Sequence, residues 1–126
     1  MVASYGTKEK AAATKLHSLV VRTRDNFTCR WCGVSKSNGK QIQCAHIISR
    51  SLSATRTDER NAVALCASCH WKQSKNPLLW ARWIEKELGS EELDFLIEKS
   101  QSKVKVDWAA ECERLQAALD LLTSAR

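Results

Sequence analysis

The sequence lacks long hydrophobic runs, internal repeats and low-complexity linkers. A helix needs about 20 consecutive apolar residues to cross a bilayer, and no stretch approaches that length, so we expect no contact with a membrane. No signal-peptide pattern follows Met1, and the expected location is therefore the cytoplasm. A chain of 126 residues without linkers predicts one domain with a single modest core.

Disulfide bonds are not expected either, although the chain has six cysteines, because thiols stay reduced in the cytoplasm. Four of them form two Cys-x-x-Cys pairs, Cys29–Cys32 and Cys66–Cys69. Two such pairs can place four thiolates around one tetrahedral zinc ion, and the alternative is a set of buried reduced cysteines. The 33 residues between the pairs exceed the usual zinc-ribbon spacing, which predicts a folded insertion. We expect Cys112 in the core face of a helix and leave Cys44 unassigned.

The net charge of +6 is unevenly distributed along the chain. Residues 1–58 contain ten Lys or Arg and three Asp or Glu, a net +7, whereas residues 59–126 contain ten and eleven, a net −1. A basic half favours a polyanionic partner, of which nucleic acid is the commonest. The alternative is a solvated basic surface with no binding role.

Hydrophobic periodicity and turn residues predict the order of elements. A helix with Thr7 as N-cap should run to Arg24, with His17 on its surface or at the edge of the core. The remaining expected elements are a turn at Asn38-Gly39, a strand over residues 41–48, a loop over 49–60, a strand over 61–65 and a short helix to Lys75.

Three more helices are expected after residue 76. The first of these helices should have Asn76 as its N-cap and Pro77 as its first residue, and it should stop at Gly89. Leu79 should face inward on this helix. A second helix should begin at Ser90-Glu91-Glu92, with Leu93, Leu96 and Ile97 buried. A basic strip, Lys103–Val106, precedes a third helix, capped by Asp107 and carrying an apolar seam of Trp108, Cys112, Leu115, Leu119 and Leu122. This seam should pack on the domain or on a second copy of the chain, giving a homodimer.

Three residues lie in order around the second cysteine pair: His46, Asn61 and His70. Together with Leu-Cys-x-x-Cys-His-x-x-x-x-Lys and the lead-in Arg-x-Arg-Asp-x-Phe-x-Cys-x-x-Cys-Gly, they resemble the HNH (His-Me finger, ββα-metal) endonucleases over roughly residues 15–76. The stretch from Arg56 to Asn61 and the tail LLWARWIEKELGSEELDFLIEK are similar, more loosely, to the NinG/Rap recombination nucleases of lambdoid phages.

The HNH resemblance implies a role for each of these residues. His46 would be the general base that takes a proton from water, a task that suits neutral imidazole. Asn61 would hold the loop and orient that histidine, and His70 would bind a catalytic Mg²⁺ or Mn²⁺ ion distinct from the structural Zn²⁺. The expected contacts to DNA phosphates are Arg50, Arg56, Lys72 and Lys75. Trp31 and Trp71 are further candidates for contact with DNA, whereas Trp80, Trp83 and Trp108 should serve packing.

Ala45 departs from the HNH pattern, because family members usually have a metal-binding Asp, Glu or His immediately before the general base. Three explanations remain open. A loop carboxylate such as Asp58 could complete the metal site, Cys44 could do so from the strand face that it shares with His46, or the site could be degenerate.

These observations predict an α+β domain with a zinc-bound ββα-metal core over residues 7–76, an N-terminal helix and a helical C-terminal extension over 77–126. The HNH resemblance implies metal-dependent hydrolysis of phosphodiester bonds in DNA. The looser resemblance to NinG/Rap implies a phage-encoded nuclease that acts on branched recombination intermediates. The alternatives are a non-catalytic zinc-finger DNA-binding protein on a degenerate HNH fold and an RNA-processing or toxin nuclease on the same motif.

Overall fold

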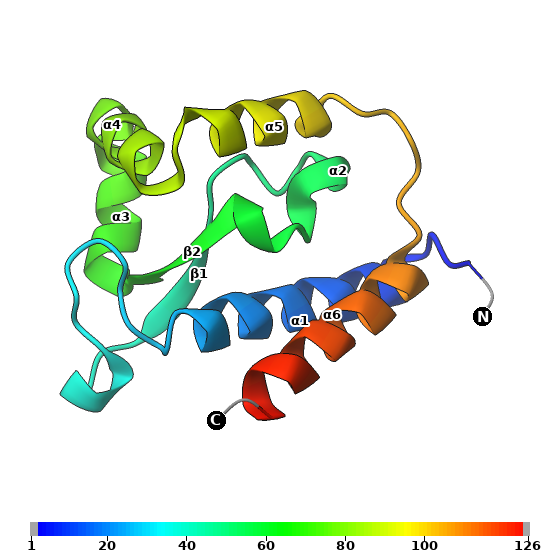
Figure 1. Cartoon of the computed structure of the whole chain (residues 1–126), viewed down its shortest axis with the longest axis horizontal. Helices are drawn as coiled ribbons and strands as arrows, with labels where there is room; N and C mark the ends of the chain where they lie inside the picture. The colour runs from blue at the N-terminus through cyan, green and yellow to red at the C-terminus, as the bar shows by residue number, and fades with distance from the viewer. Residues whose placement is uncertain (1–2, 125–126) are drawn as a thin grey trace.

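A computed structural model describes residues 3–124 of the chain (Figure 1). Helices predominate around one small sheet. In chain order the elements are α1 (Thr7–Arg24), η1 (Lys36–Asn38), β1 (Ile42–His46), α2 (Ser53–Arg56), η2 (Glu59–Asn61), β2 (Ala62–Cys66), α3 (Ala67–Lys75), α4 (Pro77–Leu88), α5 (Ser90–Ser100) and α6 (Trp108–Ser124).

The sheet consists of β1 and β2, which pair antiparallel with Ile42 opposite Cys66 and His46 opposite Ala62. Every residue of β2 is buried. Helix α1 packs against the sheet, and α3 continues directly from β2 and packs back onto both strands. Two strands followed by a helix form a ββα unit, so the predicted α+β class is confirmed.

Two apolar clusters hold this arrangement together. The first lies between the sheet, the two cysteine pairs and α4, which contributes Trp80 and Ile84. The second lies between α1 and α6, which run side by side (Figure 1), and it is centred on the buried Trp108 and Leu115. The apolar seam of α6 therefore packs on α1 of the same chain. This is the face through which we considered that a second copy of the chain could bind.

Several local predictions differ from the structure. Thr7 is the first residue of α1 and Gly6 is its N-cap. Leu79 and Ile97 are exposed, whereas Trp80, Ile84 and Leu96, which we also expected in the interior, are buried. The expected Asn38-Gly39 turn is the end of a 3-10 helix, after which Gly39 adopts a left-handed conformation with φ 76°. The loop after β1 also contains α2 and η2.

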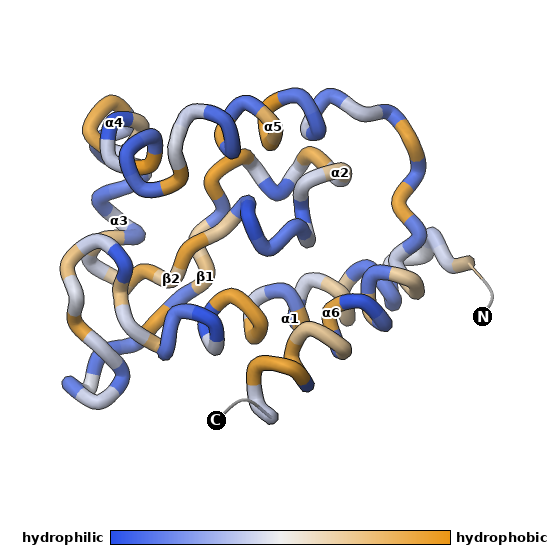
Figure 2. The backbone as a smooth tube through the Cα atoms, in the orientation of Figure 1, coloured by the Kyte–Doolittle hydropathy of each residue, from blue (hydrophilic) through white to orange (hydrophobic). Residues whose placement is uncertain are grey.

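The colouring by hydropathy in Figure 2 marks β2 as a hydrophobic strand in the middle of the molecule and the linker between α5 and α6 as an alternation of hydrophilic and hydrophobic residues. Among residues 3–124, none of the helices combines the length and the apolar character that crossing a membrane requires.

Candidate functional site

The four paired cysteines converge on one point. Their Sγ atoms all lie within 4.8 Å of one another, and the Sγ atoms of Cys32 and Cys66 are 3.7 Å apart. Four sulfurs bound to zinc at about 2.3 Å in a tetrahedron lie about 3.8 Å from each other. The cluster Cys29, Cys32, Cys66 and Cys69 therefore fits a structural zinc ion, and all four are free of disulfide bonds.

The backbone around this cluster stabilises thiolates. Cys32 N–H donates to the Sγ of Cys29 at 3.5 Å, and Cys69 N–H donates to the Sγ of Cys66 at 3.4 Å. Gly33, with φ 86°, provides the left-handed turn after the first pair. Although burial by itself raises the pKa of Cys29, hydrogen bonds from neighbouring backbone N–H groups lower it to about 7. The thiolate is the form that binds metal, so these bonds favour zinc.

His46 ends β1 and is held through one ring nitrogen. Its Nε2 donates to the backbone carbonyl of Arg56 at 2.8 Å, and this bond leaves Nδ1 with a free lone pair. Burial lowers the pKa of His46, and the positive charges of Arg50 and Arg56 lower it further, although the hydrogen bond to the Arg56 carbonyl raises it. The imidazole is therefore neutral at pH 7 and able to accept a proton.

His17 lies directly against His46, with ring centroids 5.0 Å apart. It is fully buried, whereas the surface or the edge of the core was predicted, and its Nε2 donates to the backbone carbonyl of Asp58 at 3.0 Å. Its Nδ1 lies 3.9 Å from the Sγ of Cys44, whose pKa burial raises to about 11. Cys44 is thus a protonated thiol that donates to His17.

His70 comes from the first turn of α3 and is half-buried. Its Nδ1 donates to Oε1 of Gln43 at 2.5 Å, which leaves Nε2 as the nitrogen with a lone pair. A histidine that binds a metal usually donates its other ring N–H to a fixed acceptor in this way. Burial lowers the pKa of His70, so its neutral, ligating form prevails at pH 7.

Asn61 is buried at the end of η2 and holds the loop between the two strands. Its Oδ1 accepts from Ile48 N–H at 2.8 Å, and its Nδ2 donates to the carbonyls of Ile48 and Thr55 at 3.1 and 3.0 Å. These bonds fix the loop one residue away from Arg56, whose carbonyl holds His46.

Asp58 and Cys44, the two proposed second metal ligands, are occupied elsewhere. Asp58 is bound by Arg60 and by Lys99, each at 2.7 Å. Although burial opposes it, these two bonds hold the pKa of Asp58 well below its usual range. Within residues 3–124, three or more metal-binding side chains come together only at the four cysteines.

Four basic residues were predicted to contact DNA, and the structure places them differently. Arg50 is exposed, whereas the guanidinium of Arg56 is bound to Thr14 Oγ1 and to the carbonyl of Arg50, each at 2.9 Å. Lys72 and Lys75 lie in the last turn of α3, next to Trp31 and Trp71 respectively. Trp31 stacks on Trp83 at 5.2 Å between centroids and so serves packing, whereas Trp71 is exposed.

Residues 29–76 match the model of a family described as HNH endonuclease. Residues 29–76 form an HNH domain. The matched segment contains both cysteine pairs and all three of His46, Asn61 and His70. An HNH domain suggests nuclease activity. No curated protein and no solved structure matches the chain, so the resemblance to NinG/Rap nucleases stays a prediction.

Three residues of the HNH domain and its surroundings were missed in the sequence. Gln43 binds His70, Gln73 Nε2 donates to the backbone carbonyl of His46 at 2.9 Å, and His17 packs on His46. Gln73 follows His70 by three positions and so shares its helix face, which is a usable signal. The contacts of Gln43 and His17 depend on the tertiary fold.

The burial of His17 predicts a loss of stability in mild acid. Burial lowers its pKa to about 4, whereas the unfolded chain has a value of 6.5. The unfolded state therefore binds a proton first as the pH falls below 6.5, and stability is lost down to about pH 4. The full difference corresponds to about 3 kcal/mol.

We expect the free energy of unfolding in urea to fall less between pH 7 and pH 5 in His17→Gln than in the wild type. The Gln side chain is neutral at every pH and can still donate to the Asp58 carbonyl. Parallel curves for the two proteins would show that His17 titrates normally in the folded state.

Proposed function

We propose that the chain is a metal-dependent endonuclease that hydrolyses phosphodiester bonds in DNA, with His46 as the general base. The observation that carries this proposal is the Nε2 bond from His46 to the Arg56 carbonyl, which fixes the tautomer. The lone pair on Nδ1 can then take a proton from water as that water attacks phosphorus. Because its pKa is lowered, His46 is ready for this step without first losing a proton.

His70 holds the catalytic ion in this proposal. Gln43 fixes the ring so that Nε2 is presented for binding. A bound Mg²⁺ or Mn²⁺ would stabilise the negative charge that develops on the phosphate and on the leaving oxygen. Mg²⁺ commonly keeps several waters and needs few protein ligands, which suits a site with one histidine.

Asn61 positions His46 through the backbone in this proposal, and Arg56 supports it. Because Asn61 binds Ile48 and Thr55, the carbonyl of Arg56 has a fixed place beside His46. Arg50 and Arg56 also give the edge of the site a positive charge, and neither forms a salt bridge within the part of the chain that the structure describes.

The second candidate is a DNA-binding protein that kept the HNH fold without its activity. Ala45 favours it, because this residue is fully buried in the apolar cluster and supplies no ligand beside His70. The test is incubation of the purified protein with plasmid DNA, branched DNA and RNA under Mg²⁺, Mn²⁺ or EDTA, beside His46→Ala. Cleavage by the wild type but not by His46→Ala would support the nuclease hypothesis.

The looser resemblance to NinG/Rap extends the proposal to a phage-encoded enzyme that cuts branched recombination intermediates in the cytoplasm of a host cell. Faster cleavage of branched DNA than of a linear duplex would support this extension. A homodimer is no part of the proposal, since the seam of α6 packs on α1.

DNA affinity should fall steeply with salt, because each neutralised phosphate of a duplex contributes about 0.9 to the slope of log affinity against log salt. Arg50→Ala and Lys72→Ala should each reduce that slope by about one in anisotropy measurements on a duplex. We choose Arg50 over Arg56 because the Arg56 guanidinium also binds Thr14.

The matched control is Lys86→Ala, which removes one exposed positive charge from α4. Its slope should equal that of the wild type. An affinity that does not depend on the salt concentration would contradict phosphate contacts at Arg50 and Lys72. An equal reduction of the slope in Lys86→Ala would contradict them as well.

A further inference from the structure

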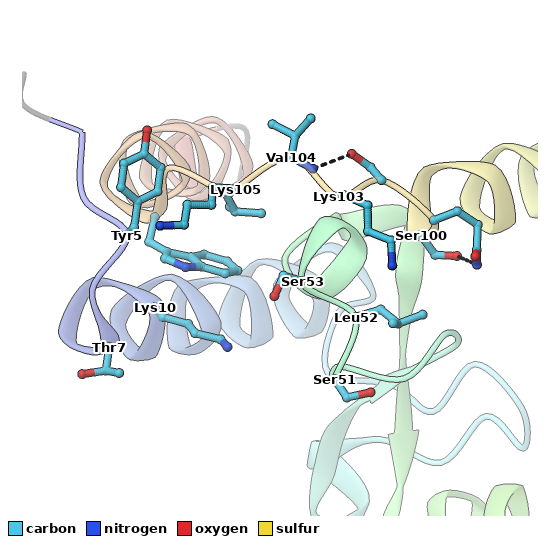
Figure 3. Close-up of a pocket in the computed structure, with 14 residues that line it drawn as sticks. Tyr5, Thr7, Lys10, Ser51, Leu52, Ser53, Ser100, Lys103, Val104 and Lys105 are labelled. Atoms are coloured by element: carbon cyan, nitrogen blue, oxygen red, sulfur yellow. Dashed lines mark hydrogen bonds between the residues drawn. The ribbon is translucent and has the colours of Figure 1, made fainter.

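A pocket of about 510 Å³ is lined by none of the histidines of the HNH domain (Figure 3). Its walls come from three separate parts of the chain: the N-terminal end of α1, the residues around the start of α2, and the linker over residues 101–107 that joins α5 to α6. Nothing in the proposed mechanism uses this pocket or the basic strip Lys103–Val106, which forms one of its walls.

The pocket is positively charged. Lys10, Lys103 and Lys105 line it, and none of its lining residues is acidic. Among residues 3–124 no salt bridge involves any of these three lysines. The neighbouring Asp107 does not neutralise them by pairing, because its Oδ1 accepts from the backbone N–H groups of Ser4 and Ala110 at 3.1 Å each. Such a pocket attracts an anion with several charges.

Apolar and aromatic side chains lie among these charges. Tyr5, Leu52 and Val104 are all exposed at the pocket, Val104 by 78%. The Nζ of Lys105 lies 5.5 Å from the ring centroid of Tyr5, so a cation and an aromatic ring occupy the same wall. Double-stranded DNA presents mainly phosphates to such a surface, because its bases are stacked inside. An unpaired strand presents phosphates to the lysines and base faces to the apolar groups.

The short helix α2 connects this pocket to the active site. Its first residue, Ser53, lines the pocket, and its last residue, Arg56, holds His46 through the backbone carbonyl. The guanidinium of Arg56 binds Oγ1 of Thr14, and Thr14 lies one turn along α1 from Lys10. One helical turn is about 5.4 Å, so positive charge continues from Arg56 to the pocket without a long gap.

We propose that this pocket binds an unpaired DNA strand that continues from the strand positioned at His46. The second half of this statement rests on the proposed function, whereas the binding of single-stranded DNA in the pocket does not. The lysines contact successive phosphates, and Tyr5 stacks on a base. A nuclease with this feature prefers a substrate with an unpaired arm beside the cleaved position.

The test is fluorescence anisotropy with a short labelled single strand and with a duplex of the same sequence, without added divalent ion so that no cleavage occurs. Lys103→Ala/Lys105→Ala should weaken single-strand binding about tenfold and reduce its salt slope by about 1.4, since each phosphate of a single strand contributes about 0.7. Tyr5→Ala should weaken it about fivefold or more with an unchanged slope. Duplex affinity should change less than twofold in both variants.

The matched control is Arg82→Ala/Lys86→Ala, which removes two exposed positive charges from α4. Its single-strand binding should equal that of the wild type. Equal losses in the two double variants, equal losses for the duplex and the single strand, or no loss at all would each overturn the inference. A wild type that cuts no DNA but binds the single strand through these residues would refute the proposed function and leave the pocket standing.

Discussion

His46→Ala should lower the rate of DNA cleavage by about 10²–10⁴, because a positioned general base typically contributes that factor. DNA affinity and zinc content should stay close to those of the wild type. The imidazole is neutral at pH 7, so the substitution removes no charge, and His46 is not one of the four clustered cysteines. The measurement is single-turnover cleavage of a labelled DNA, with binding measured in parallel.

The lowered pKa of His46 adds a second readout to this experiment. A general base must be deprotonated, so wild-type cleavage should rise with pH through the pKa of His46, with its midpoint below the pKa of an unperturbed histidine. Free imidazole should restore part of the activity of His46→Ala by entering the space that the ring occupied. A loss of folding, measured by circular dichroism, would mean that the substitution acts through structure.

His70→Ala is the matched variant, because it removes the other half-buried histidine of the site. It should also abolish cleavage, but excess Mn²⁺ and not imidazole should restore part of the activity if His70 holds the ion. Identical responses of the two variants to both treatments would contradict the separate roles. A wild type that cuts no DNA with any divalent ion, and binds as His46→Ala does, would favour the degenerate DNA-binding protein.

Local sequence signals predicted much of the fold. The boundary between α3 and α4 follows from Asn76-Pro77, and the end of α4 follows from Gly89, because proline and glycine restrict the backbone regardless of what packs on it. The burial of Leu79 and Ile97 was wrong for the converse reason. Helical periodicity gives a set of apolar faces, and the packing of α4 and α5 decides which of them is buried.

The candidate site divides in the same way. The two cysteine pairs and the three motif residues were visible in the sequence because their spacing carries the chemistry. The contact between His17 and His46 was not, because it depends on how α1 packs on the sheet, and His17 lies 29 positions before His46. The apolar seam of α6 was visible, but its partner, α1, became clear only in the structure.

Cys66→Ser should remove zinc from the chain and unfold the core. Cys66 belongs to the four-cysteine cluster, ends β2, and caps α3 by accepting from the backbone N–H of Cys69. The free energy of binding a structural zinc ion is about 10–16 kcal/mol and is folding free energy, whereas a whole domain is stable by only about 5–15 kcal/mol. Loss of one ligand should therefore abolish a cooperative thermal transition, as measured by circular dichroism beside elemental analysis for zinc.

Cys112→Ser is the matched control, since it makes the same atomic change outside the cluster. The Sγ of Cys112 donates to the backbone carbonyl of Glu9 at 3.5 Å, and a hydroxyl can donate to the same oxygen. This variant should keep one zinc ion per chain and melt close to the wild type, whereas a chelator should unfold it as it unfolds the wild type. The zinc site would be refuted by wild-type protein that is well folded and free of zinc, or by Cys66→Ser that melts like Cys112→Ser. The same reasoning would explain why so short a sheet is stable. Cys66 is the end of a strand and the cap of a helix, and as a zinc ligand it would let the ion join the two cysteine pairs across the 33 residues that contain His46 and Asn61.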